Sequence, residues 1–466
     1  MTGSTGATAE LAARALAVEI GSLAAPTVEH AKAAVLDLLG SAIRARAESA
    51  TSAAVQRALS ALGASGAQTA IGYGPAFAPQ YAALLNACNF HVLDFDDTHE
   101  RSSLHPGAPV VGAALTEAER LGASGTRLIA AIVAGYDVAV RVGIALDPAV
   151  HYARGFHPTA TAGVFGGTAA AALLHGDGVE TLTSAFGINL SQASGSLQFS
   201  VDGAQTKPLQ VGFAAHDAVL ARELAAAGIR GPAAALEGRS GLLHAYSDGA
   251  DPELLVARWD GVHEIDRTAF KPYPCCRYMH AAIDQLAAIV REHRLDPRTV
   301  ERVRIALPPA GLRLCAYPEE RKRRPASIVD AQFSMYYTAA ATLAWGSVRW
   351  DDFARRDAPE ITALIERVTV VEDPAVERLV PAMAALVEVD AGSLYERRLA
   401  AEPRGEPSSP LGWAELVEKF NDLSAVAYDE ARRARIVALV RSLDRLDDLR
   451  TLTAELGAAS LAPARN

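Results

Sequence analysis

The stretch Thr159–Leu174, TATAGVFGGTAAAALL, decides the fold class of this chain. Most of it is alanine, glycine and threonine, and alanine is the strongest helix former. Small side chains let a helix approach its neighbours closely, because the side chains at the contact set the distance between helix axes. We therefore predict a helix here, in the middle of a helical bundle.

Three longer segments on either side repeat alanine and leucine at helical spacing, with glycine and proline between them. They are HAKAAVLDLLGSAIRARA (30–47), TRLIAAIVAGYDVAVRVGIAL (126–146) and AAHDAVLARELAAAG (214–228). β-Branched residues are sparse up to about residue 265, and hairpin signals are weak there. The first part of the chain is thus predicted to be helical.

The pattern changes after His263. Apolar and polar residues alternate as in strands over 300–308, 366–373 and 384–392, with helical segments at 279–293 and 327–345. The tail from Trp413 is again helical and charged. We predict a mainly α protein, with a large all-helical bundle domain (1–266, completed by 400–466) and a smaller α+β lid domain (267–399).

Composition narrows the function classes. The chain has 466 residues, 50% of them hydrophobic and 21% charged, with a net charge of −10. Such a chain lacks the general basic surface that nucleic acids or acidic membranes bind. Its four cysteines are too few for a disulfide scaffold, and the N-terminus shows no secretory pattern. We expect a cytoplasmic protein that binds neither nucleic acid nor membrane.

Four basic side chains each stand directly before a proline: His105, His157, Lys207 and Lys271. Proline fixes its own φ angle and restricts the preceding residue, so each basic group is held on a stiff turn. The lysines stand out, because the chain has five lysines against 39 arginines and only lysine can lose its proton when desolvated. X-Pro is common in loops, but the set indicates an anion-binding site with acid–base chemistry.

The segment Leu93–Val110, LDFDDTHERSSLHPGAPV, gathers carboxylates and imidazoles. A metal site is one interpretation, but the spacing of the common helical zinc motifs is absent. We favour a turn held by local hydrogen bonds or an acid–base role. The ionisable residues of this segment's first part are Asp94, Asp96, Asp97, His99 and Glu100.

The segment His151–Gly163, HYARGFHPTATAG, places His157 at the start of the small-residue helix. A helix N-terminus offers unpaired N–H groups and partial positive charge, which bind carboxylates. The same field keeps a nearby histidine neutral and available as a base. Arg154 is placed to bind a second carboxylate in bidentate fashion. A histidine that only caps the helix is the alternative.

The densest chemical cluster is FKPYPCCRYMHAAID, residues 270–284. Lysine, tyrosine, two cysteines, arginine and histidine fall close together near the predicted join between domains, where clefts form. These cysteines do not make a zinc motif, because no second ligand pair follows at suitable spacing. The vicinal thiols either supply a base or pack as small apolar residues.

Five segments together resemble the MmgE/PrpD family, in family order. They are 93–110, 155–172, 203–215 (GAQTKPLQVGFAA), 270–284 and 330–337 (DAQFSMYY). The resemblance extends over roughly residues 10–450. It implies a homodimer without a cofactor, whose subunit has a large helical domain and a smaller α+β lid. The family includes 2-methylcitrate dehydratase, cis-aconitate decarboxylase and iminodisuccinate epimerase.

The resemblance also implies a set of pocket residues. Those of the decarboxylase branch match here at Asp94, Thr98, His105, His157, Lys207, Lys271 and Tyr337. Cys276 stands in place of a family histidine, and the segment between Thr98 and His105 is one residue longer. The dehydratase branch reads His-Pro-Ser-Asp where this chain has His-Pro-Gly-Ala from His105. These departures disfavour assignment to either branch.

We therefore predict an isomerase, an epimerase that removes and returns an α-proton on a di- or polycarboxylate such as iminodisuccinate. His157 or a lysine is the expected base. Lys207, Lys271 and Arg154 are the expected anion clamps. The alternatives are a hydro-lyase of the 2-methylcitrate dehydratase type, with His105 and Asp94 as an acid pair, and a non-catalytic polycarboxylate-binding protein.

Further site candidates complete this hypothesis. The candidates for a second base are Tyr152, Tyr337 and Cys276. The substrate-binding candidates are Thr98, Arg154, Tyr273, Arg277 and His151. No metal and no cofactor are expected.

Overall fold

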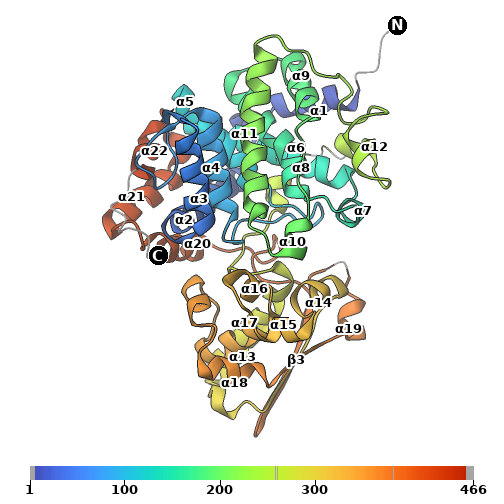
Figure 1. Ribbon diagram of the computed structural model, residues 1–466, viewed down its shortest axis with the longest axis vertical. Coiled ribbons are helices and arrows are strands. Elements are labelled where there is room, and N and C mark those ends of the chain that lie inside the picture. Colours follow the sequence, from blue (N-terminus) through green and yellow to red (C-terminus); the bar gives the residue numbers. More distant parts are fainter. Residues whose placement is uncertain (1–5, 258, 260, 381, 458–466) are drawn as a thin grey trace. The chain divides into compact units, whose positions relative to one another are not determined.

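The computed structural model describes residues 6–257, 259, 261–380 and 382–457 of the chain. It divides into two compact units, one made of the residues up to Phe270 and those from Gly412, the other of Lys271–Leu411. Helices build nearly all of the first unit, whereas the second combines helices with a sheet (Figure 1). The prediction of a mainly α fold with a small sheet is thus confirmed.

The first unit is built around α8 (Pro158–His175), which is buried along almost its whole length. It packs against three helices of the same unit: α5 (Gly107–Leu121), α6 (Gly125–Ala145) and α11 (Thr206–Ala226). Glycines permit the close approach. A Cβ on Gly166 would lie 2.6 Å from the backbone O of Gly135, and one on Gly163 would lie 2.5 Å from Pro109 Cγ. The small-residue stretch is central because larger side chains do not fit there.

The C-terminal tail packs against α2 (Ala25–Glu48) through α20 (Trp413–Ser424). A buried ion pair joins the two helices, with Lys419 Nζ 2.6 Å from Asp37 Oδ1. The same ammonium group donates to the backbone O of Phe95 at 2.7 Å. The tail is therefore tied both to α2 and to the loop that follows α4.

The remaining helices of this unit are α1 (Ala7–Leu16), α3 (Ala50–Ala61), α4 (Pro79–His91), α7 (Pro148–Ala153), α9 (Val179–Asn189), α10 (Gln198–Asp202), α12 (Leu242–Tyr246), α21 (Glu430–Arg441) and α22 (Arg450–Leu456). A short strand, β1, spans Ser65–Gln68. By length and composition alone α6 is able to cross a membrane, but its apolar window is entirely buried inside the protein. Its place in the structure is that of a core helix.

A four-stranded sheet organises the second unit, in the order β3-β2-β4-β5. Its strands are β2 (Arg302–Ala306), β3 (Val368–Val371), β4 (Ala385–Ala391) and β5 (Leu394–Ala400). β2 runs parallel to β3 and antiparallel to β4, and β4 forms a hairpin with β5. Gly392 begins the hairpin turn with a φ of +67°, which glycine adopts without strain.

The second unit also contains α-helices. They are α13 (His280–His293), α14 (Pro309–Cys315), α15 (Glu319–Arg323), α16 (Ile328–Gln332), α17 (Met335–Trp345), α18 (Pro359–Ile365) and α19 (Pro374–Glu377). The single helix predicted over 327–345 is wrong, because Ser334 leaves helical geometry and its Oγ accepts the Tyr337 N–H at 3.1 Å, which starts α17 anew. β5 was not predicted, since charged residues occupy much of it and neither of its faces is fully buried.

Candidate active site

The candidate site of the first unit begins in the loop between α4 and α5, where Asp97 is fully buried. The Gly107 N–H donates to Asp97 Oδ1 at 3.1 Å, and the Tyr136 hydroxyl donates to Oδ2 at 2.8 Å. Burial, with the Asp96 carboxylate beside it, raises the pKa of Asp97 to about 8. Asp97 therefore holds the loop against α5 and α6.

His105 lies at the end of this loop. Its Nδ1 is 2.8 Å from the backbone O of Asp97, which only accepts, so Nδ1 carries the hydrogen and Nε2 keeps its lone pair in the neutral ring. Asp96 Oδ1 is 3.5 Å from the same nitrogen, while Asp96 Oδ2 is 2.7 Å from His91 Nδ1. The His91 and His105 rings meet edge to face, with centroids 4.9 Å apart. Asp96 thus connects two histidines.

His157 precedes α8 and is buried. The Gln210 amide orients it, because Gln210 Nε2 donates to the backbone O of Ser196 at 2.9 Å and so turns Oε1 towards His157 Nδ1, also at 2.9 Å. An amide oxygen only accepts, so Nδ1 carries the hydrogen and Nε2 the lone pair. Burial, and then the charges of His91 and Lys207, hold the pKa of His157 well below its usual value. His157 is therefore a neutral imidazole with a defined basic nitrogen.

Lys207 stands in the first turn of α11, with Nζ 2.6 Å from Asp94 Oδ1. Asp94 has a φ of +52°, a left-handed conformation that is uncommon for a residue other than glycine. The Asp94 carboxylate partly offsets the lowering of the His157 pKa, which places this ion pair beside the imidazole. The His157 and His91 ring centroids are 5.8 Å apart. The structure thus brings together four predicted residues around His91: Asp94, His105, His157 and Lys207.

Of the five ionisable residues of the 94–100 segment, Asp96 alone lies in a cluster with the spacing of metal ligands. His99 is engaged with Ser102, whose Oγ is 2.8 Å from His99 Nδ1. That cluster, the trio His91, Asp96 and His105, offers three ligand atoms within 4.8 Å of one another. Because His91 Nδ1 is hydrogen-bonded to Asp96 and His105 Nδ1 to the backbone O of Asp97, we interpret this trio as part of a hydrogen-bonded network.

The backbone of Thr98 pairs with a residue far along the chain. Its N–H donates to the backbone O of Ala269 at 2.9 Å, and its own backbone O accepts the Ala269 N–H at 2.7 Å. This bridge ties the loop after α4 to the last residues of the first unit.

Three other predicted site residues form hydrogen bonds or ion pairs outside this histidine cluster. His151 is fully buried, and its ring nitrogens lie 2.9 and 3.2 Å from a threonine hydroxyl and a backbone oxygen. Arg154 forms an exposed ion pair with Asp248 at 2.9 Å. Tyr152 donates to the backbone O of Ser103 at 3.1 Å. These contacts support α7 and the neighbouring loop, and they leave Arg154 as a surface cation.

In the second unit, Lys271 is buried, with 1% of its surface exposed. The Tyr273 hydroxyl donates to Asp284 Oδ1 at 2.7 Å, and burial raises the pKa of this phenol. Arg277 forms a buried ion pair with Glu406 at 2.7 Å. This pair holds the loop after β5 in the second unit, which therefore extends beyond the predicted boundary at residue 399. Tyr273 and Arg277 are thus each bonded to a carboxylate of the second unit.

Cys276 and Tyr337 lie in the same unit. The Cys276 N–H donates to the backbone O of Gln332 at 2.9 Å. The Tyr337 ring is buried in α17, 5.4 Å from the ring of Phe353, and burial raises the pKa of its phenol. Tyr337 is therefore protonated at neutral pH and able to donate a proton.

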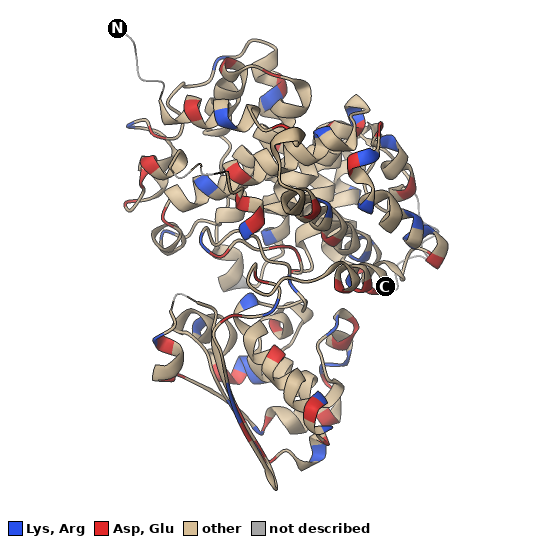
Figure 2. Cartoon of the chain, turned by 180° about the vertical axis from the view of Figure 1, so that it is seen from behind, with Lys and Arg blue, Asp and Glu red and all other residues tan. Residues whose placement is uncertain are grey.

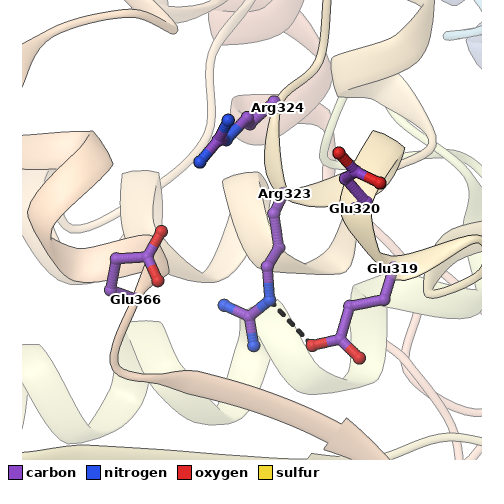
Figure 3. Close-up of a pocket in the computed structure, with 5 residues that line it drawn as sticks. All are labelled: Glu319, Glu320, Arg323, Arg324 and Glu366. Atoms are coloured by element: carbon purple, nitrogen blue, oxygen red, sulfur yellow. Dashed lines mark hydrogen bonds and ion pairs between the residues drawn. The ribbon is translucent and has the colours of Figure 1, made fainter.

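A charged hollow of about 400 Å³ opens beside α15 (Figure 3). Arg323 in its wall pairs with Glu319 at 2.8 Å and donates to the backbone O atoms of Ile365 and Val368. Its guanidinium group thus joins α15 to the segment before and within β3. Acidic and basic residues are interspersed over the helices of both units (Figure 2). The residues that line the hollow all belong to the second unit: Glu319, Glu320, Arg323, Arg324 and Glu366.

Sequence reasoning missed His91 and Gln210. His91 ends α4, where nothing in the local pattern separates a catalytic histidine from a helix-terminal one. Gln210 follows Lys207 by three residues and so shares its face of α11, a spacing that was available as a signal.

Comparison with known proteins relates this geometry to a family. Residues 9–255 match the MmgE/PrpD N-terminal domain, and residues 273–445 match the MmgE/PrpD C-terminal domain. The chain belongs to the MmgE/PrpD family. The resemblance predicted from the sequence segments is thus confirmed.

Several curated members of the MmgE/PrpD family are similar to this protein along most of its length. The cis-aconitate decarboxylase of Aspergillus terreus is 27% identical over 412 residues, which cover 83% of each chain. That of Homo sapiens is 27% identical over 396 residues, covering 80% of this chain and 79% of the relative. That of Mus musculus is 26% identical over 392 residues, covering 80% and 78%. The relatives are thus enzymes of a lyase type.

Proposed function

We propose that this MmgE/PrpD protein is an enzyme that transfers a proton at the carbon next to a carboxylate of a small di- or tricarboxylate. In this proposal it works without a cofactor, as a cytoplasmic homodimer, and its reaction is an epimerisation of a substrate such as iminodisuccinate. One observation carries the proposal. His157 is a buried neutral imidazole whose tautomer is set by Gln210, beside a lysine–aspartate pair.

A general base must be unprotonated and correctly oriented when the substrate binds. His157 Nε2 meets both conditions, so we assign it the removal of the α-proton. The negative charge that develops on the substrate carboxylate needs a cation nearby. Lys207 supplies this cation, because an incoming substrate carboxylate competes with Asp94 for the Lys207 ammonium group.

Epimerisation requires that a second group return the proton to the opposite face. Tyr337 is protonated and buried in the second unit, and Cys276 stands there in place of a family histidine. We propose these two as candidates for the proton donor. Tyr152, whose hydroxyl is bound to a backbone oxygen at the surface of the first unit, is the weaker candidate.

Decarboxylation is the second candidate, and the names of the relatives favour it. Loss of carbon dioxide leaves a carbanion that also requires a nearby cation and a proton donor. The hydro-lyase alternative is less favoured. The dehydratase branch carries serine at position 107, whereas a Cβ on Gly107 would lie 2.5 Å from Asp97 Oδ1 and 2.6 Å from the Tyr136 hydroxyl.

Proton NMR in deuterium oxide tests the proposal with three substrates in parallel samples: stereochemically pure iminodisuccinate, cis-aconitate and 2-methylcitrate. Loss of the α-proton signal of iminodisuccinate together with appearance of its other stereoisomer is the expected result. Formation of itaconate from cis-aconitate would establish the decarboxylase instead. A new methyl singlet on a double bond, formed from 2-methylcitrate as its hydroxyl group leaves, would establish the hydro-lyase and refute our ranking.

Two variants address the assignment of the base. His157→Asn should lower the rate of α-proton exchange at least 100-fold, since general base catalysis contributes that much. His216→Asn, at a half-buried histidine that pairs with Asp217 on α11, is the matched control and should retain the rate. Lys207→Ala separates an enzyme from a binding protein, because an enzyme loses turnover far more than substrate affinity.

A further inference from the structure

Two thiols and one ammonium group gather in the second unit around residues 332–334. The Cys276 N–H donates to the backbone O of Gln332 at 2.9 Å. Lys322 Nζ lies 5.9 Å from the ring centroid of the next residue, Phe333. The Ser334 hydroxyl donates to the backbone O of Lys322. Cys276 and Lys322 are therefore positioned by three consecutive residues.

Cys315 ends α14 and faces the same cluster. Gly311 is four residues earlier and so lies on the same side of the helix. A Cβ on Gly311 would lie 3.2 Å from Tyr278 Cβ, which shows that this side of α14 packs directly on the residues after Cys276. The Cys315 thiol is within hydrogen-bonding reach of the Cys276 thiol. Neither cysteine is part of a disulfide in the structure.

The electrostatics make the two thiols unequal. Burial raises the pKa of Cys315, and its hydrogen bond to Cys276 raises it further, so Cys315 stays protonated and is the S–H donor of the pair. Lys322 is itself partly buried, which lowers the pKa of its ammonium group, and the two thiols oppose that lowering. A Cys276 thiolate thus has a cation beside it and an S–H donor in contact.

The accessibility of the two thiols also indicates that Cys276 reacts before Cys315. Cys276 retains 7% of its surface exposed, whereas Cys315 retains none. Cys88 serves as a comparison, because it is fully buried in α4 and burial raises its pKa to about 12. Thiolates react with peroxides and protonated buried thiols do not. Among these three cysteines, Cys276 is the one suited to react first.

We propose that Cys276 and Cys315 form an oxidation site that takes a peroxide and closes into an intramolecular disulfide. The Cys276 thiolate attacks one peroxide oxygen, the O–O bond breaks, and the leaving hydroxide takes up a proton as water, which leaves a sulfenic acid on Cys276. The Cys315 sulfur then attacks the Cys276 sulfur, and the hydroxyl group leaves with the Cys315 proton as a second water. The sulfur atoms lose two electrons and the peroxide gains them. This inference does not depend on the proposed function.

Peptide mapping after oxidation tests this proposal. The full-length protein is treated with hydrogen peroxide, quenched, alkylated with N-ethylmaleimide while denatured, and cleaved with trypsin without reductant. The tryptic peptides 268–277 and 314–321 hold these cysteines. We expect these two peptides to be recovered joined by a disulfide, with Cys88 fully alkylated. Recovery of both peptides alkylated, or of a Cys275–Cys276 linkage within one peptide, would overturn the proposal.

Variants separate the steps without requiring loss of the fold. Cys275→Ser, the matched control at the adjacent buried thiol, should form the cross-link as the natural chain does. Cys315→Ser should give no cross-link and should accumulate a sulfenic acid at Cys276 that dimedone traps. Lys322→Met should slow cross-linking about tenfold and Lys322→Arg should restore it, since the cation stabilises the thiolate. An unchanged rate in Lys322→Met would refute the role of the ammonium group.

Discussion

The replacement of Gly107 by serine is expected to destabilise the loop that carries the histidine site. A Cβ at this position would lie 2.5 Å from Asp97 Oδ1 and 2.6 Å from the Tyr136 hydroxyl, whereas ordinary contacts begin at 3.4 Å. Both groups are buried, and they are hydrogen-bonded to each other at 2.8 Å. The neighbours must therefore move by nearly one ångström, or the hydrogen bond must break.

The magnitude follows from two costs. Overpacking of a well-packed core costs about 1–3 kcal/mol, and a buried polar group left without its partner costs about 1–3 kcal/mol more. The opening free energy of α5, which begins at Gly107, should thus fall by roughly 2–6 kcal/mol in Gly107→Ser.

Native-state hydrogen exchange of peptides from α5 measures this quantity directly. Gly21→Ser is the matched control, because a Cβ on Gly21 meets no atom within 4 Å, and it should change protection by less than about 0.5 kcal/mol. Protection of α5 that is equal in Gly107→Ser and the natural chain would refute the steric argument, and with it our reason for ranking the hydro-lyase last.

Three further predictions concern buried charges. The pKa of Asp97 is raised to about 8 in the folded protein, so its contribution to stability is present below pH 4 and is lost as the pH rises towards 8. Asp97→Asn should therefore remove a pH dependence of the opening free energy of up to about 1.4 kcal/mol per pH unit, measured by hydrogen exchange at several pH values. Lys419→Met leaves the Asp37 carboxylate buried without this cation and should cost α20 about 3–5 kcal/mol, whereas equal protection of α20 would contradict the buried pair. The pKa of His157 lies below its usual value, so the acid limb of the kcat/KM profile should lie below pH 6.5, and an acid limb above pH 6.5 would exclude His157 as the base. Gln210→Leu removes the amide that orients the imidazole and should lower the maximal kcat/KM.

Much of the fold was available from local sequence pattern. The stretch Thr159–Leu174 is the central helix because its small side chains admit close neighbours, and this property belongs to the residues themselves. Strands β2, β3 and β4 were predicted from alternation, since one face of each is buried. β5 escaped the pattern because its charges, Glu396, Arg397 and Arg398, fall on both faces, and the less exposed face is only half-buried.

The site shows where local pattern ends. His105, His157 and Lys207 were predicted from their types and their proline neighbours, and Asp94 from a segment rich in carboxylates. The structure places these four residues around His91. The sequence did not reveal His91 itself, because its function depends on Asp96 and two other histidines that the fold brings to it. Arg154 is the opposite case. Its position in the sequence predicted carboxylate binding, but in the structure its guanidinium group is paired with Asp248 at the surface.

The sequence by itself determined the long helices of the first unit, most of the strands, the family and the types of residue at the site. These properties depend on side-chain size, periodicity and backbone restriction, which act over a few neighbouring residues. Only the tertiary structure decided which nitrogen of His157 is basic and which thiol faces Cys276. Tautomers, ion pairs and pKa values depend on burial and on charges brought close in space, and groups far apart in the chain supply them.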